Sequence, residues 1–428
     1  MEDSFYRLIA LGGFFIILFL AWGTGARSAI NRKTVFGSLT LIWFIGALVF
    51  WFPPSRTVLK WVNDGLVALL SASQKGSLFL FGPLALGPGQ SLPNGTTSIG
   101  FVLAMQVLPA VIFFSALVSA LYYLNIMPAI VRAFGKLFHK TMKLSGAESL
   151  SASANIFVGI ESSLTVKPWL ANMTRSELLT LLTCMMATVA STVLGVYVIA
   201  LIGVFPQIAG HLVSASVISI PCAVLVSKLS LPETQTPETL GNVPEKSSGA
   251  SQEKPANLMV ALIDGGQQGT KMAVGIATLL IVVLGLEALV DLILSILPQI
   301  EDQSISVSRV LGWLTWPFVV LLGLRPEEWQ AASQILGSRF VETEVTAYFS
   351  LGSAQSATPP TFSPRSFTAM SYALCGFVHF ASLGIFIGGL AALIPNRMSE
   401  LSLLGIRALW TAFLATLLTG CVAGVLAH

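Results

Sequence analysis

The feature that most constrains this chain is a series of uninterrupted apolar stretches. Each is about 20 residues long, the length that a helix needs to cross about 30 Å of hydrocarbon. The stretches are continuous instead of alternating in polarity, which favours helices over a transmembrane barrel. The sequence therefore predicts an all-α integral membrane protein with eight spanning helices, at residues 8–24, 35–52, 99–125, 175–204, 209–228, 271–297, 364–394 and 403–427.

Composition supports this class and excludes others. Hydrophobic residues make up 54% of the chain and charged residues 10%, whereas soluble proteins carry about 25% charged residues. The net charge of +3 is scattered and forms no basic patch, so no nucleic-acid partner is predicted. The four cysteines lie apart, which predicts neither disulfides nor zinc sites. Phosphate-binding loops, zinc-protease motifs and nucleophile elbows are also missing from the sequence, so a pump driven by ATP or a common membrane hydrolase is not supported.

Basic residues in the connecting loops predict the topology. They follow the first and third predicted spans and surround the connection between the fifth and sixth: Arg27, Arg32, Lys33, Arg132, Lys136, Lys140, Lys143, Lys246, Lys254 and Lys271. The positive-inside rule makes these loops cytoplasmic and places both termini outside. Residues 56–72 form an amphipathic pattern that predicts a helix along the membrane interface. Residues 229–257 are polar and rich in Pro, Ser and Glu, which indicates a flexible linker.

Two segments, about 145–172 and 326–361, are too polar to span the membrane as single helices and too apolar to be ordinary loops. Each carries an acid in a Ser/Thr-rich setting, Glu161 in the first and Glu344 in the second. A helix-start signal follows each. The first is the capping-box spacing from Thr174 to Glu177, and the second is proline after Ser363.

Two long apolar stretches follow each interrupted segment, so the chain repeats one unit. The loop assignment brings the first segment in from the cytoplasm and the second from outside, which makes the repeats inverted. Inverted repeats with paired broken segments are typical of secondary transporters whose site lies near the bilayer midplane. The predicted divisions are a scaffold at 1–98, a third span with an amphipathic helix at 99–144, a first repeat at 145–228, a linker at 229–258, a sixth span at 259–325 and a second repeat at 326–428.

Several polar side chains inside apolar segments are candidate ligands. A carboxylate at the bilayer centre costs at least about 2.5 kcal/mol, so Glu161 and Glu344 each need a partner, a cation or a polar ligand. A structural salt bridge is the alternative reading. His379 lies in the predicted seventh span with Ser382 one turn further, so both side chains share a face and either bind a ligand or pack against a neighbouring helix. Lys167 is expected to extend toward the surface.

Small polar residues suggest a cation site. Na⁺ in transporters is often bound by carbonyls of unwound helices together with a few side chains. Asn155, next to the Phe-Val-Gly turn, and Thr188, in the fourth predicted span, have oxygens suited to that role. Small polar residues also mediate ordinary helix packing in membranes, and spacing alone does not distinguish the two.

Longer motifs carry a resemblance to a known family. LPAVIFFSALVSALYYLNIM (108–127), SGAESLSASANIFVG (145–159), MTRSELLTLLT (173–183) and FSPRSFTAMSYALCGF (362–377) resemble the concentrative nucleoside transporters, in the same order. The resemblance runs from about residue 99 to the end of the chain. It implies a homotrimer of eight spanning helices with two opposed re-entrant hairpins per chain, importing nucleosides with Na⁺ or H⁺.

The resemblance also implies roles for individual residues. The Na⁺ ligands would be Asn155, the Val158 carbonyl, Thr188 and the Val189 carbonyl. The ribose would contact Glu344, Ser382 and His379. Glu161 with its neighbour Ile160 would face the base, and Phe377 and Val193 would shape the pocket.

The chain departs from the family pattern at both hairpins. Gly159-Ile-Glu-Ser-Ser163 stands where members commonly have Gly-Gln-Thr-Glu-Ala-Pro, which alters the base-facing turn. Thr343 and His379 stand at positions that are usually asparagine, which alters the ribose-facing side. Glu344 and His379 can form a proton-binding pair, so H⁺ coupling stays open beside Na⁺ coupling.

The sequence therefore predicts a bacterial inner-membrane symporter for nucleosides and not an enzyme. A carrier of the same fold for a modified nucleoside, a nucleobase or another polar metabolite is the nearest alternative. A nucleoside-binding channel or sensor belongs to a different class. A membrane enzyme would need Glu344 and His379 as its catalytic pair.

Overall fold

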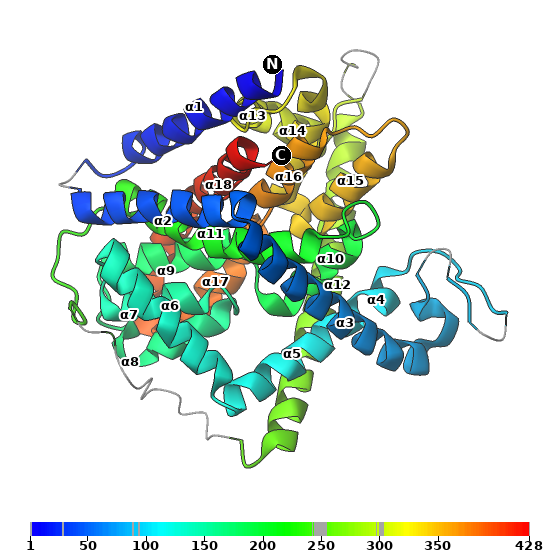
Figure 1. Cartoon of the computed structure of the whole chain (residues 1–428), viewed down its shortest axis with the longest axis horizontal. Coiled ribbons are helices and arrows are strands. Elements are labelled where there is room, and N and C mark those ends of the chain that lie inside the picture. Colours follow the sequence, from blue (N-terminus) through cyan, green and yellow to red (C-terminus); the bar gives the residue numbers. More distant parts are fainter. Residues whose placement is uncertain are drawn as a thin grey trace.

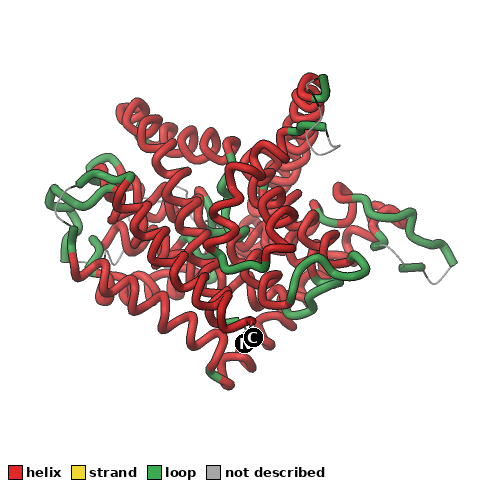
Figure 2. Tube along the Cα trace, turned by 90° about the horizontal axis from the view of Figure 1, so that it is seen from above, coloured by secondary structure: helices red, strands yellow, loops and turns green. Residues whose placement is uncertain are grey.

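The computed structural model describes residues 2–27, 30–87, 90–92, 95–241, 243, 255–296, 298 and 304–427. These residues are almost entirely helical and contain one isolated β-bridge, between Ser91 and Thr97. Seven of the described helical segments are long and apolar enough to cross a membrane. The termini lie close together (Figures 1 and 2), because α1 (Glu2–Gly23) packs along α18 (Met398–Leu426). The Arg7 side chain also donates to the Ala427 carbonyl at 2.7 Å. The predicted all-α class is confirmed.

The N-terminal part begins with three helices: α1 (Glu2–Gly23), α2 (Arg32–Trp51) and α3 (Pro53–Phe81), followed by the 3-10 turn η1 (Gly82–Ala85). Asn31 caps α2, its side chain accepting from the Lys33 N–H at 3.0 Å. Proline at the start of α3 ends the preceding helix, because proline lacks an N–H and fits the first helical turn. The amphipathic helix expected at 56–72 is thus part of a longer helix.

Two helices far apart in the sequence pack closely on each other. After α4 (Leu103–Gln106) and α5 (Leu108–Tyr123) come α6 (Ile126–Met142) and, later in the chain, α12 (Leu258–Leu294). In Figure 1, α5 and α12 lie together to one side of the bundle. Gly265 and Gly269 of α12 face α5, and a Cβ at Gly269 would lie 2.7 Å from Ile112 Cα. Small residues four apart allow this close approach, as in other membrane helix pairs.

The remaining helices form two units. The first unit contains α7 (Gly146–Ala154), η2 (Ile160–Val166), α8 (Lys167–Leu170), α9 (Arg175–Ala187), α10 (Ser191–Leu201) and α11 (Ile208–Ser230). The second contains α13 (Val307–Leu321), η3 (Pro326–Glu328), α14 (Trp329–Glu342), α15 (Glu344–Ser356), α16 (Pro364–Ala373), α17 (Phe380–Leu393), η4 (Pro395–Arg397) and α18 (Met398–Leu426). In the first unit the chain reverses direction between α7 and α8, and in the second between α14 and α15. Each reversal is followed by a broken helix, α9–α10 or α16–α17, and then by a long helix, α11 or α18.

Both predicted helix starts are present. Thr174 and Glu177 form the capping box, with the Thr174 hydroxyl accepting from the Glu177 N–H and the Glu177 carboxylate accepting from the Thr174 N–H. Ser363 caps α16, and Pro364 is its first residue.

Several predicted spans differ from the structure. The fourth span is interrupted at 188–190 and the seventh at 374–379, so neither is a continuous helix. Helix α12 starts at Leu258 instead of 271, and α13 was not expected. The expected linker at 229–257 starts later, because α11 continues to Ser230; residues 242 and 244–254 of it lie outside the described residues.

Candidate transport site

The second chain reversal places a carboxylate at a strained turn. Helix α14 ends at Glu342, and Thr343 adopts φ 98°, a conformation that costs a β-branched residue about 1–3 kcal/mol. Such strain persists only where the surroundings require that one backbone conformation. The Thr343 hydroxyl accepts from the Val345 N–H, which begins α15 directly at Glu344. The turn therefore aims Glu344 inward, where the residue is 3% exposed.

Two groups from other helices contact this carboxylate. Tyr197 of α10 donates to Glu344 Oε1 at 2.8 Å, and His379 Nε2 lies 3.0 Å from Oε2. His379 Nε2 is close to Oε2 but is not aligned for a hydrogen bond, so Oε2 has no well-aligned donor among the described residues. A buried carboxylate oxygen normally accepts at least one hydrogen bond. Glu344 Oε2 therefore keeps acceptor capacity for a ligand beside His379.

His379 is positioned by the break in the seventh predicted span. The sequence predicts a position inside a continuous helix, and that prediction is wrong. It is the N-cap of α17, and its Nδ1 accepts from the Ser382 N–H at 3.1 Å. A backbone N–H can only donate, so Nδ1 carries no proton and the single ring proton lies on Nε2, facing Glu344. His379 and Ser382 therefore lie together through this capping box and not, as predicted, on one face of a helix.

The same break positions Phe377 and Ser382. The Ser382 hydroxyl donates to the carbonyls of Phe377 and His379 at 2.5 and 2.6 Å. Phe377 is half-buried with its ring centroid 6.0 Å from that of Phe386. Val193 lies one turn before Tyr197 on α10 and is 3% exposed. The structure therefore brings Glu344, His379, Ser382 and Phe377 together, and Tyr197 of α10 joins Glu344.

The first chain reversal lies against the break in the fourth helix. Helix α7 ends at Ala154, and its nine residues, mostly Ser, Ala and Gly, are all buried. Helix α9 ends at Ala187 and α10 begins at Ser191, with Thr188 extended between them at φ −123° and ψ 166°. The Phe157 carbonyl accepts from the Ser191 N–H at 2.9 Å. This bond joins the 155–159 turn, which contains Val158, to the break that contains Thr188 and Val189.

Asn155 has an unused oxygen at this junction. The residue is fully buried, and its Nδ2 donates to the Ser151 carbonyl at 3.0 Å, whereas Oδ1 has no donor among the described residues. The Thr188 hydroxyl donates to the Cys184 carbonyl at 2.9 Å, so the lone pairs of the hydroxyl oxygen can still bind a cation. A neutral set of amide, hydroxyl and backbone oxygens suits a hard cation such as Na⁺. The residues present therefore fit the predicted ion.

Glu161 lies in η2 and is not among the groups that contact Glu344 in the described part of the chain. Its Oε2 turns back toward its own turn, 3.7 Å from where a Gly159 Cβ would be. Its neighbour Ile160 reaches α17, where a Cβ at Gly389 would lie 1.9 Å from Ile160 Cδ1. Lys167 is exposed. The first turn therefore contacts the helix that follows His379.

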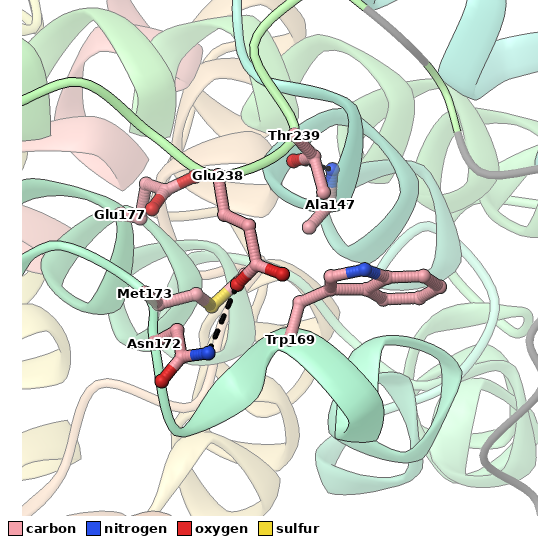
Figure 3. A pocket seen from close by; sticks show the side chains of 7 residues that line it. All are labelled: Ala147, Trp169, Asn172, Met173, Glu177, Glu238 and Thr239. Atoms are coloured by element: carbon pink, nitrogen blue, oxygen red, sulfur yellow. Dashed lines mark hydrogen bonds between the residues drawn. The ribbon is translucent and has the colours of Figure 1, made fainter.

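A crevice of about 150 Å³ lies at the base of the first reversal, away from both turns. Figure 3 shows Glu238 and Thr239, from the segment after α11, lying over Trp169, Asn172 and Ala147. The Asn172 amide donates to Glu238 at 3.1 Å, and Thr239 accepts from the Ala147 N–H at 2.9 Å. Ligand pockets usually enclose about 300–1,000 Å³, so this crevice is a packing feature and not the site.

Sequence reasoning missed two residues here. Tyr197 donates to Glu344, and Arg339 lies fully buried on α14. The available signal was chemical, because each is a strong donor inside an apolar or Ser-rich stretch, where it needs an acceptor. Their partners come from other helices, which sequence spacing does not reveal.

Two chain reversals and two broken helices, joined inside an apolar helical bundle, define the class of secondary transporters. Three family descriptions match the chain: "Na+ dependent nucleoside transporter C-terminus" at residues 211–424, "Na+ dependent nucleoside transporter N-terminus" at 12–84 and "Nucleoside recognition" at 104–205. The chain belongs to the Na⁺-dependent nucleoside transporter family.

Individual relatives agree with this assignment. The chain is 31% identical over 429 residues to the nucleoside permease NupC of Helicobacter pylori, covering 98% of each chain. It is 33% identical to the uncharacterized transporter YutK of Bacillus subtilis, covering 97% of this chain and 98% of that one. It is 32% identical to the rat sodium/nucleoside cotransporter 1, covering 98% of this chain but 64% of the longer rat protein.

Solved structures show the same fold. The inward-facing, substrate-bound structure of CNTnw matches with a TM-score of 0.88 at 30% identity, covering 98% of both chains. An outward-facing state of a double variant of CNTnw matches with a TM-score of 0.87 at 29% identity, covering 98% of this chain and 97% of that one.

Proposed function

We propose that this chain is a cation-coupled secondary transporter that imports nucleosides by alternating access, and that it is not an enzyme. One observation carries the proposal. Both turns and both helix breaks meet in a buried region where Asn155 Oδ1 has no donor among the described residues and Glu344 Oε2 has only the poorly aligned His379 Nε2 at 3.0 Å. Leaving a buried acceptor unpaired costs about 1–3 kcal/mol, so each oxygen favours a state with a bound ligand.

The nucleoside binds between the two turns in this proposal. Glu344 Oε2 accepts from a ribose hydroxyl, and His379 and Ser382 provide the remaining polar contacts to the sugar. Phe377 and Val193 form the apolar wall of the pocket. Ile160 and Glu161 face the base, where the chain differs most from the family pattern. A modified nucleoside or a nucleobase is therefore the alternative substrate.

Sodium is the proposed coupling ion, bound by Asn155, Thr188 and the carbonyls of Val158 and Val189. A cation there satisfies Asn155 Oδ1 and joins the first turn to the fourth-helix break. Binding the ion first would fix the turn that faces the base, so the ion raises nucleoside affinity. Protons are the alternative coupling ion, with Glu344 and His379 as the acceptors.

The setting follows from the loop charges and the family. The chain is proposed to lie in the inner membrane with both termini on the periplasmic side, to assemble as a homotrimer, and to place both reversals as re-entrant hairpins. The large exposed apolar side chains of α12, such as Ile281, Leu289 and Ile293, suit contact with lipid or with a second copy.

Uptake by proteoliposomes tests the proposal. Radiolabelled uridine and adenosine are offered under an inward Na⁺ gradient, an inward H⁺ gradient or neither. Accumulation above equilibrium with Na⁺ alone is the expected result, whereas accumulation with H⁺ alone would assign coupling to Glu344 and His379. Equilibration without accumulation would indicate a channel. A folded, inserted protein that moves neither nucleoside under any gradient would contradict nucleoside transport.

A further inference from the structure

A fully buried arginine lies in the second chain reversal, on the helix that precedes the Glu344 turn. Arg339 of α14 is 0% exposed, and its Nη1 donates to the Ala373 carbonyl at 2.7 Å while its Nη2 donates to Thr416 Oγ1 of α18 at 3.3 Å. Its Nε has no hydrogen-bond partner among the described residues. The guanidinium also lies 5.8 Å from the centre of the Phe413 ring. A buried charge that is incompletely paired is costly, so it needs an explanation beyond packing.

The Ala373 carbonyl, which accepts from Arg339 Nη1, lies at the C-terminus of α16. Ala373 is the last residue of α16, so its carbonyl has no partner within that helix and carries the partial negative charge of a helix C-terminus. From the other arm of the same reversal, Tyr348 of α15 donates to the Ser371 carbonyl at 2.9 Å. Both arms are therefore hydrogen-bonded to the last turn of α16, directly before the break that ends at His379.

The two helix breaks cross a few residues further on. A Cβ at Gly376 would lie 2.8 Å from the Met186 carbonyl oxygen and 3.0 Å from Ala187 C, immediately before Thr188. It would also lie 2.8 Å from Cγ2 of Thr416, the residue that accepts from Arg339. Only glycine allows this approach. A continuous series of contacts thus runs from Arg339 through Thr416 and Gly376 to the backbone beside the proposed ion ligands.

We propose that Arg339 is a positioning residue that couples ion binding to nucleoside binding by fixing the seventh-helix break against the fourth-helix break. This inference rests on the proposed function. By binding Ala373 and Thr416, Arg339 sets the distance between Glu344 and His379. The same contacts press Gly376 onto Met186 and Ala187, so a cation that orders the fourth-helix break also orders the sugar-binding groups.

The test measures uridine affinity of the purified full-length protein in Na⁺ and in choline. We expect wild-type affinity to rise at least about tenfold in Na⁺, and the ratio to fall below about threefold in Arg339→Met, which keeps the apolar stem but removes the charge. Arg339→Lys keeps the charge but lacks the planar guanidinium group with its several donors, so it should give an intermediate ratio. A purely structural arginine would lower the melting temperature of Arg339→Met and leave the ratio unchanged, and that result would overturn the proposal.

A second variant keeps the proposal testable if Arg339→Met does not fold. Gly376→Ala retains Arg339 but separates the two breaks, and it should reduce the ratio as strongly. Gly388→Ala is the matched control, because a Cβ there meets nothing within 4 Å. If Arg339→Met does not fold, a wild-type ratio in folded Gly376→Ala refutes the proposal.

The same measurements distinguish a failure of the proposed function from a failure of the positioning role of Arg339. If wild-type protein binds uridine equally in Na⁺ and choline, Na⁺ coupling is wrong, and Arg339 is then judged by its affinity alone. Affinity at least about tenfold weaker in Arg339→Met, partly restored in Arg339→Lys, retains the positioning role. Unchanged affinity overturns it. If uridine does not bind at all, the Na⁺-induced rise in melting temperature gives the readout, and an equal rise in wild type and Gly376→Ala overturns the coupling.

Discussion

The two chain reversals differ in where their polar contacts lie. The first is attached mainly at its base, where Lys228 lies 2.7 Å from Glu148 and Thr239 accepts from the Ala147 N–H. The second is attached along its arms and at its tip, through Arg339, Tyr348 and Glu344. Both units contain a reversal, a broken helix and a long helix, but their polar contacts are distributed differently.

This difference indicates how the two halves of the site work. The second turn carries a carboxylate whose position is set by Tyr197 and His379 before any ligand arrives. The first turn, in contrast, has Asn155 Oδ1 and the Ser162 hydroxyl without partners among the described residues. We infer that the sugar-binding half is preorganised and that the ion completes the base-facing half. Preorganisation reduces the ordering cost of binding at the second turn only.

The largest expected effect comes from the preorganised turn. Glu344→Ala removes the acceptor for Tyr197 and the partner of His379, leaving both buried donors unpaired. We expect nucleoside uptake to fall at least about 100-fold, to the background of empty liposomes, because breaking a buried pair costs about 3–5 kcal/mol. Glu327→Gln is the control, since Glu327 is exposed near the start of the same reversal. Saturable uptake by folded Glu344→Ala above a tenth of the wild-type rate would show that the second turn is not the sugar site.

An intermediate effect is expected at the first turn. Asn155→Ala removes the unpaired Oδ1 and should raise the half-saturating Na⁺ concentration about tenfold, with a smaller change in maximal uptake at high Na⁺. The control is Asn172→Ala, whose side chain donates to Glu238 at the base of the same reversal, away from Asn155. A variant Asn155→Ala that changes maximal uptake but keeps the wild-type Na⁺ dependence would contradict the proposal that the ion completes the first half of the site.

A smaller effect, about a two- to fivefold rise in the KM for uridine, is expected for His379→Asn. Nδ1 of His379 accepts from the Ser382 N–H and caps α17, while Nε2 lies 3.0 Å from Glu344 Oε2. Asparagine offers an oxygen to the same N–H, so the variant keeps the cap, but its shorter side chain loses the contact with Glu344. An unchanged KM in the folded variant would show that the contact with Glu344 does not shape the sugar-binding half. Uptake driven by an inward H⁺ gradient in wild type and lost in the variant would instead favour proton coupling.

The sequence predicted the helical class and both interrupted segments, and it singled out the polar residues that the proposed site uses, because hydropathy and isolated polar groups are local signals. It did not predict the breaks at 188–190 and 374–379. Neither break contains proline, and a window of about 19 residues averages two short apolar helices into one long one. His379 was consequently placed within a helix, although it begins one. Tyr197 and Arg339 were missed because their acceptors lie in other helices.

The contact between Ile160 and Gly389 was equally invisible to sequence reasoning, and it gives the smallest expected effect. Gly389→Ala introduces a methyl group 1.9 Å from the position of Ile160 Cδ1, so the flexible end of that side chain must move and the base-facing turn shifts away from α17. We expect the KM for uridine to rise about two- to threefold at an unchanged maximal rate, because only the half of the site that the ion completes is disturbed. Gly388→Ala, with no atom within 4 Å of its new Cβ, should match wild type. Shortening Ile160 to valine makes room for the new methyl group, so the Ile160→Val/Gly389→Ala pair should recover the wild-type KM. A KM that stays raised in the double variant would mean that α17 itself, and not the first turn, has moved.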